Sequence, residues 1–246
     1  HYAGVPCEMD VIMDIAQRHN LLVVEDAAQA LLSTYKGKAL GSIGHFGCLS
    51  FHETKNIISG EGGALLVNDE RYTERAEIIR EKGTNRSQFF RGEVDKYTWV
   101  DIGSSYLPSE LVSAFLYAQL ERAGDITAQR CRICSAYAEQ LAPLEQAGKL
   151  RLPHFDADSN GHMFYILPDS LATRTALIAH LKARDIHPVF HYVPLHSSPA
   201  GRKYGRASGA MQVTDDLSAR LLRLPLHYEM DDADVARICA AIHDFF

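Results

Sequence analysis

The sequence lacks the features that mark nucleic-acid-binding and membrane proteins. Its 246 residues carry 25 Lys and Arg against 31 Asp and Glu, a formal net charge of -6. No basic field is therefore available to hold nucleic acid phosphates or an anionic membrane. No run approaches the roughly 20 apolar residues that span a bilayer, and the opening HYAGVPCEMD has neither region of a signal peptide. These absences predict a cytoplasmic protein.

Cysteine is also scarce, since the chain holds five and an odd count does not suit a disulfide framework. Cys131 and Cys134 form a CxxC inside a stretch with helical character, and no second pair of this spacing exists. Packing inside a helix is favoured over a metal or redox role.

The pattern that is present alternates between helix and strand. Apolar residues at Val11, Ile12 and Ile15 predict an amphipathic helix, and the continuous run LLVVED at 21–26 predicts a fully buried strand. This succession is half of a βαβ unit and indicates an α/β fold. The other elements predicted in this half are strands over 46–51 and 63–68, a charged helix over 69–83, and a long functional loop over 84–106.

The second half begins with a long helical stretch over 109–146, with Gly124 as the expected break. Shorter elements follow: strands over 162–168 and 186–192 and helices over 174–185, 215–224 and 232–246. We predict two domains: 1–124 as the C-terminal part of a large domain with a mainly parallel sheet, and 125–246 as a smaller α/β domain. Too few strands remain for a complete parallel sheet, so we expect the chain to lack an N-terminal part of the large domain.

Two residues suggest chemistry. Asp26 follows a predicted strand at the sheet edge where α/β proteins bind ligands, although an aspartate there could equally cap a helix. Lys55 lies between a strand and the glycines of SGEGG, where a confined amine could attack a carbonyl, whereas most lysines are simply solvated. The glycines follow the lysine, which excludes a P-loop.

VVEDAAQA followed by GCLSFHETKNIISGEGGALLVND resembles the DegT/StrS family of sugar aminotransferases, and HYVPLHSSPAG and LLRLPLHYEM extend the resemblance. It implies the type I fold of pyridoxal-phosphate-dependent transferases. It further implies that Lys55 forms a Schiff base with pyridoxal 5'-phosphate and that Asp26 pairs with the pyridine nitrogen. Gln29 would contact the phenolic oxygen or the ring, and Ser50 the phosphate. His45, Cys48 and His52 have a spacing that could suggest a metal site, but they lie within this lysine motif, so none is expected.

The chain departs from the family at GSSYL, residues 103–107. Ser105 stands where an asparagine of the neighbouring subunit usually reaches the phosphate, so the resemblance implies a homodimer with the active site at the subunit interface. In the second domain His191, Tyr192 and His196 resemble a segment lining the sugar-nucleotide pocket, with a structural or surface histidine as the alternative for each histidine.

The resemblance implies transfer of an amino group from L-glutamate to a nucleotide-linked keto sugar. Within the family, the sequence is most similar to members that convert TDP-4-keto-6-deoxy-D-glucose to TDP-4-amino-4,6-dideoxy-D-galactose for enterobacterial surface polysaccharides. One alternative is a sugar dehydratase that uses pyridoxamine phosphate, but such enzymes carry a histidine in place of Lys55. Another is a regulator that binds cofactor or sugar without turnover.

Overall fold

The computed structural model describes residues 1–154 and 158–246. They form two compact units. The first takes in residues 1–127 and 158–162, and the second takes in 128–154 and 163–246. We propose that the domains are 1–124 and 125–246.

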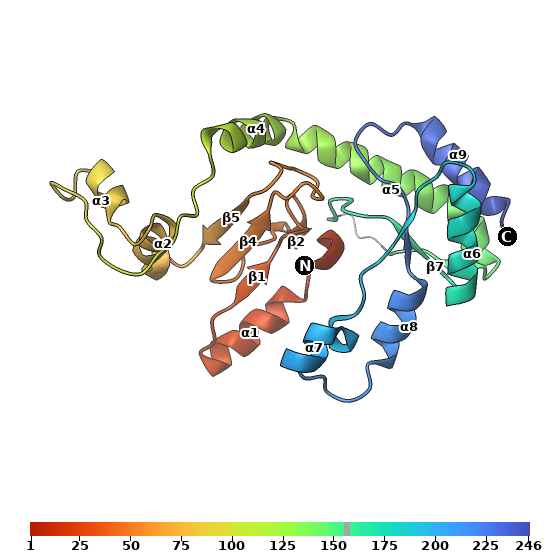
Figure 1. Ribbon diagram of the computed structural model, residues 1–246, viewed down its shortest axis with the longest axis horizontal. Coiled ribbons are helices and arrows are strands. Elements are labelled where there is room, and N and C mark those ends of the chain that lie inside the picture. Colours follow the sequence, from red (N-terminus) through yellow and green to blue (C-terminus); the bar gives the residue numbers. More distant parts are fainter. Residues whose placement is uncertain (155–157) are drawn as a thin grey trace. The chain divides into compact units, whose positions relative to one another are not determined.

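A three-stranded sheet forms the centre of the first unit (Figure 1). Strand β1 (Val24–Asp26) pairs in parallel with β4 (Phe46–Ser50), and β5 (Gly63–Val67) pairs with β4 in the antiparallel sense. Helix α1 (Met9–His19) precedes β1, as its apolar spacing predicts. Tyr35 lies in the hairpin of β2 (Thr34–Tyr35) and β3 (Lys38–Ala39). The core beneath α1 is formed by Met9, Ala27, Ala30, Tyr35 and Leu40.

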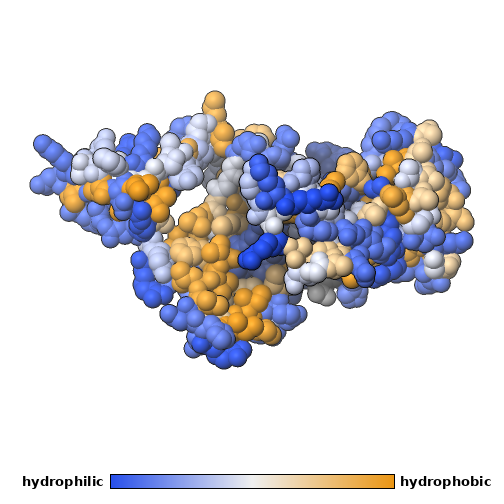
Figure 2. Space-filling view, turned by 60° about the horizontal axis from the view of Figure 1, so that its bottom comes forward, coloured by the Kyte–Doolittle hydropathy of each residue, from blue (hydrophilic) through white to orange (hydrophobic). Residues whose placement is uncertain are grey.

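The prediction of a fully buried strand at 21–26 is wrong for the described residues. Only Val24–Asp26 is extended, and Leu22 and Val24 are 53% and 60% exposed. Strand β1 is an edge strand of the described sheet, so an apolar run there has no neighbour on one side. Figure 2 shows apolar side chains gathered over this sheet and α1.

The charged segment after β5 forms two helices. A short 3-10 turn (Glu70–Tyr72) leads into α2 (Thr73–Arg80), which ends three residues before the predicted end at Gly83. The residue after its C-cap is Lys82, with a φ of 61°, and Gly83 follows with a φ of 73°. The predicted loop over 84–106 contains one short helix, α3 (Arg86–Phe90), and otherwise only isolated bridges.

The long helical stretch is divided two residues earlier than predicted. Helix α4 (Glu110–Glu121) has Arg122 as its C-cap, and α5 (Ala123–Gln146) includes Gly124 within its first turn. Ser109 caps α4 by accepting a hydrogen bond from the Val112 N–H. No helix among the described residues is long and apolar enough to cross a membrane.

The second unit packs helices on an antiparallel sheet of four strands in the order β6-β7-β9-β8. Its strands are β6 (Leu150–Arg151), β7 (Tyr165–Pro168), β8 (Val189–Phe190) and β9 (Leu222–Arg223). Its helices after α5 are α6 (Leu171–Lys182), α7 (Pro199–Tyr204), α8 (Gln212–Arg220) and α9 (Asp232–His243). The predicted helix over 215–224 is therefore wrong at its end, where 222–223 form β9. Side chains such as Tyr137, Phe164, Leu181 and Ile242 are fully buried in the core of this unit.

Candidate functional site

Four of the predicted cofactor residues, Asp26, Gln29, Ser50 and Lys55, lie at or beyond the end of the sheet where β1 and β4 terminate. Because β1 and β4 are parallel, both strands end there, and the register pairs Asp26 with Cys48, two residues before Ser50. Ser50 in turn pairs with Gly63 at the start of β5. The segment with Lys55 joins the end of β4 to the start of β5, so it begins and ends at this same end of the sheet.

Asp26 is exposed, and its carboxylate accepts one hydrogen bond, from the Ala28 N–H at 3.1 Å. A turn follows β1 rather than a helix, so the helix-capping alternative for Asp26 is wrong. One carboxylate oxygen binds the turn, and the other meets no donor among the described residues. This oxygen is available to accept a hydrogen bond from a protonated ring nitrogen.

Lys55 lies in a loop that closes on itself. Its backbone N–H donates to His52 O at 2.9 Å, and the Glu53 N–H donates to Gly60 O at 2.9 Å. Gly60 has a φ of 84°, a conformation that favours glycine and reverses the chain toward β5. The lysine side chain is half-buried and forms no hydrogen bond or ion pair with any described residue. Its amine is thus confined but unengaged.

The core fixes this loop on either side of the lysine. Phe51 and Ile57 are 6% and 2% exposed and pack with Ala123 and Ile126. Between them the side-chain amide of Asn56 donates to the backbone oxygen of Asn160 at 3.0 Å. The loop therefore has little freedom to carry its lysine away from the sheet edge.

Asn160 connects the lysine loop to the turn after β1, and the sequence analysis missed it. It is 1% exposed, and its side-chain amide donates to both Gln29 O and Leu31 O at 2.9 Å. Its own N–H donates to Ser33 Oγ at 3.1 Å. No motif marks this asparagine, because its partners lie more than a hundred positions away in the sequence.

Gln29 and Ser50 both have donor groups to spare. The Ala3 N–H donates to Gln29 Oε1 at 2.6 Å, which leaves the amide nitrogen as a donor. The His52 N–H donates to Ser50 Oγ at 3.4 Å, and the serine hydroxyl can still donate to another oxygen. Both side chains are half-buried.

These side chains fit pyridoxal phosphate. Lys55 supplies an unengaged amine for its aldehyde, and Asp26 supplies an acceptor for its ring nitrogen. Gln29 can donate to the phenolic oxygen and Ser50 to the phosphate. The chemistry of this donor set matches the group that the sequence resemblance implies.

Ser105 does not share a described contact with these four residues. It is exposed and forms an antiparallel bridge with Glu81, just after α2. Figure 1 shows α2 and α3 extending away from the sheet of this unit. Within one chain, Ser105 therefore belongs to this extension.

The three predicted substrate residues lie in the second unit. The rings of His191 and Tyr192 are 4.9 Å apart, just beyond β8. Burial, with the charge of Arg223 adding to it, lowers the pKa of His191 below 6.5. His196 Nε2 lies 2.9 Å from the carboxylate of Asp215.

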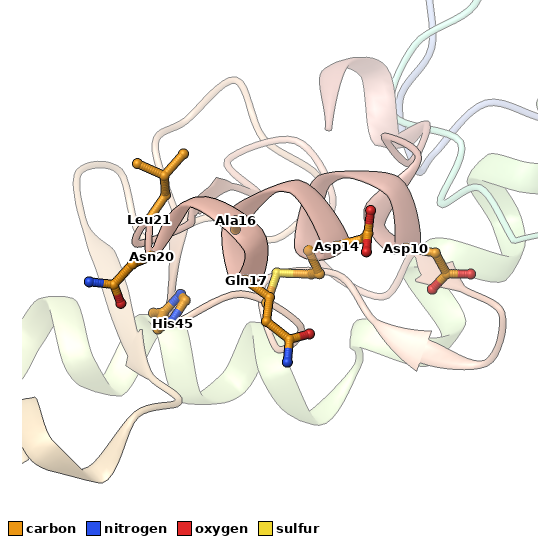
Figure 3. Close-up of a pocket in the computed structure, with 8 residues that line it drawn as sticks. Asp10, Asp14, Ala16, Gln17, Asn20, Leu21 and His45 are labelled. Atoms are coloured by element: carbon orange, nitrogen blue, oxygen red, sulfur yellow. The ribbon is translucent and has the colours of Figure 1, made fainter.

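A separate groove of about 590 Å³ runs along α1 and contains none of the predicted cofactor residues. Figure 3 shows His45 near the Asn20 end of this helix and Asp10 toward the other. Arg18 pairs with Asp14 at 2.7 Å, and Lys36 pairs with Asp10. Because its acidic groups are already neutralised, we do not place the site there.

Comparisons with known proteins agree with this chemistry. The family model of the DegT/DnrJ/EryC1/StrS aminotransferases matches residues 1–243. The GDP-perosamine synthase of Caulobacter vibrioides is 33% identical over 249 residues, which cover 98% of this chain and 63% of that protein. The spore coat polysaccharide biosynthesis protein SpsC of Bacillus subtilis is 30% identical over 254 residues, which cover 99% of this chain and 64% of that protein.

A solved structure extends the likeness to the fold. The DegT DnrJ EryC1 StrS aminotransferase from Brucella abortus has a TM-score of 0.85 and 29% identity, over 99% of this chain and 62% of that one. This confirms the predicted fold class. The chain spans less than two thirds of the length of these relatives. Aminotransferases of the matched family depend on pyridoxal phosphate. With a family match over residues 1–243, this chain belongs to the DegT/DnrJ/EryC1/StrS aminotransferase family.

Proposed function

We propose that this protein is a pyridoxal-phosphate-dependent aminotransferase that moves an amino group from L-glutamate to a nucleotide-linked 4-keto-6-deoxy sugar. The observation that carries the proposal is the unengaged amine of Lys55, held in an anchored loop at the sheet edge where Asp26 ends its strand. As the specific reaction we propose TDP-4-keto-6-deoxy-D-glucose to TDP-4-amino-4,6-dideoxy-D-galactose.

Each of the four residues has a role in this proposal. When bound, pyridoxal phosphate supplies an electron sink for the carbanion that forms when a substrate proton leaves. Lys55 Nζ accepts that proton and returns it to the neighbouring carbon, acting as base and then as acid. Asp26 accepts a hydrogen bond from the ring nitrogen and keeps it protonated. Gln29 and Ser50 orient the ring and the phosphate by donating hydrogen bonds.

We propose that the protein is a homodimer and that it is cytoplasmic. The extension after α2 exposes large apolar residues, among them Trp99 at 75% and Ile102 at 78%, a surface that a second copy would cover. Ser105 lies on the same extension, so we propose that it reaches the phosphate held by the partner subunit. The described residues contain no disulfide, which suits a reducing compartment.

The relatives support a role in surface polysaccharide synthesis. One is named GDP-perosamine synthase and another a spore coat polysaccharide biosynthesis protein. The first name specifies a GDP-linked sugar, and the second specifies a polysaccharide without a nucleotide. A panel of nucleotides and ketones, rather than one substrate, is therefore needed to test the TDP assignment.

The first test is an absorbance titration of the purified protein with pyridoxal phosphate. We expect the visible band of a lysine-bound pyridoxal, and Lys55→Ala should abolish it. Lys38→Ala removes an exposed lysine from β3 and is the matched control, which should keep the band. A band that persists in Lys55→Ala would show that another amine binds the cofactor.

The second test offers L-glutamate and a panel of TDP-, UDP- and GDP-linked keto sugars, with products identified by mass spectrometry. An amino sugar is the expected product. A deoxygenated sugar without the amino group would instead identify a dehydratase, and a bound cofactor without any turnover would identify a regulator.

A further inference from the structure

Arg223 lies on the face of the small sheet that turns away from the core. The register pairs it with Tyr165 on β7 and with Val189 on β8, so these three share one face. The neighbouring Leu222 is fully buried on the other face with Ile166. A charged side chain thus occupies one of the two central strands of the sheet.

The guanidinium of Arg223 lacks a neutralising anion within the part of the chain that the structure describes. Among the described residues no carboxylate lies within ion-pairing distance, and its Nε is buried without a hydrogen-bond partner. Arg220, three residues earlier, differs sharply: its Nη2 lies 2.8 Å from Asp216, and its Nη1 donates to Pro168 O. Buried polar atoms without partners are rare in proteins, which makes Arg223 a candidate for binding an external anion.

One tyrosine ring lies beside this charge, and a second tyrosine is its register partner. The guanidinium carbon lies 5.7 Å from the centroid of the Tyr192 ring, and Tyr192 is 64% exposed. Tyr165 is half-buried, and burial raises the pKa of its hydroxyl, so it stays a neutral donor. Asp215, in α8 of the same unit, is paired with His196.

A binding site for an anion next to an exposed aromatic ring suits a nucleotide ligand. The planar fork of an arginine matches two phosphate oxygens, and an aromatic face accepts a sugar or a base. A free amino acid would use the charge of Arg223 but not the exposed Tyr192 ring.

We propose that Arg223 binds the diphosphate of the nucleotide-linked substrate, with the Tyr192 ring packing against the attached sugar or base. This inference rests on the proposed function and adds a recognition residue to it. The sequence resemblance did not mark Arg223, because a single arginine in LLRLPLH has no distinctive spacing.

The test is calorimetric titration of the purified, cofactor-loaded protein with TDP, UDP and GDP. We expect binding of at least one, weakened about tenfold or more by Arg223→Gln, the loss of a charge-assisted hydrogen-bonded pair. Arg223→Lys keeps the charge without the fork and should fall between the two. Arg151→Gln is the matched control, since Arg151 shares the sheet face but lies on the opposite edge strand, and it should bind like the wild type.

Three outcomes would overturn the inference: no binding of any diphosphate, equal weakening in Arg223→Gln and Arg151→Gln, or a greater effect of Arg223→Gln on the KM for L-glutamate than on diphosphate affinity. Circular dichroism of each variant checks folding, and Arg223→Lys gives a second measurement if Arg223→Gln is unfolded. The proposed function fails separately, if the wild type binds a diphosphate but transfers no amino group to any keto sugar.

Discussion

Removing the side chain of Asn160 should weaken both the fold of the first unit and its hold on the cofactor. Asn160→Ala deletes two hydrogen bonds, to Gln29 O and Leu31 O, each 2.9 Å long. The residue is 1% exposed, so water does not readily replace the lost amide. The backbone bonds that Asn160 makes to Asn56 and Ser33 remain possible in the variant.

The magnitude follows from these two bonds. Each contributes a net of about 1 kcal/mol, and a buried carbonyl left without a donor costs about 1 kcal/mol more, which gives about 2 to 4 kcal/mol in total. Since Gln29 is in the turn that the amide restrains, its side chain should lose orientation as well. We therefore expect a lower free energy of unfolding together with a weaker affinity for pyridoxal phosphate.

Asn68→Ala is the matched control for this experiment. Its amide also donates to two carbonyls, Gly41 O at 2.9 Å and Gly44 O at 3.0 Å, but Asn68 follows the far end of β5. Urea unfolding of both variants and titration with the cofactor separate stability from binding. The reasoning is refuted if Asn160→Ala binds the cofactor as tightly as Asn68→Ala, or unfolds like the wild type.

Three further predictions concern groups that are buried or half-buried. Burial lowers the pKa of His191 below 6.5, so the unfolded state binds a proton at this residue more readily than the folded state does. The stability that neutral His191 contributes is therefore complete above pH 6.5 and is lost as the pH falls toward the folded-state pKa. His191→Gln should flatten the acid side of the profile of Tm against pH. Burial raises the pKa of Cys134 to about 12, so iodoacetamide at about pH 8 should modify the exposed Cys7 and spare Cys134, and mass spectrometry that finds the reverse contradicts this. Glu25 is 3% exposed and accepts backbone N–H groups, including that of Gly44 at 2.5 Å, so Glu25→Gln should lower the free energy of unfolding by about 3 kcal/mol in denaturant titrations.

Local patterns sufficed for the elements that depend on local contacts. The helix over Met9–His19 follows its apolar spacing, and Asp232–His243 begins at a capping box formed by Asp231 and Asp234. The pattern could not show that 222–223 is a strand, because the partners of these residues are in β7 and β8. Nor could an apolar run at 21–26 show which of its side chains are covered, since that depends on neighbouring elements.

The site divides in the same way. Lys55 and Asp26 are recognisable in sequence because each stands in a short motif at a strand end. Asn160 and Arg223 are not. The contacts of Asn160 come from residues far away in the sequence, and the role that we propose for Arg223 depends on which carboxylates pair with other residues. Resemblance to a family predicts which residues react, whereas the residues that we propose to support them were found only from their contacts.

The anchoring of the lysine loop bears on the order of folding and cofactor binding. Ile57 packs into the core on one side of the loop, and the side-chain amide of Asn56 donates a hydrogen bond to Asn160 O. We therefore expect the chain to fold before it binds the cofactor, with the entropic cost of ordering the loop already met by folding. A protein built in this way should survive removal of its cofactor and recover it on simple mixing, at a rate set by diffusion and bond formation rather than by refolding.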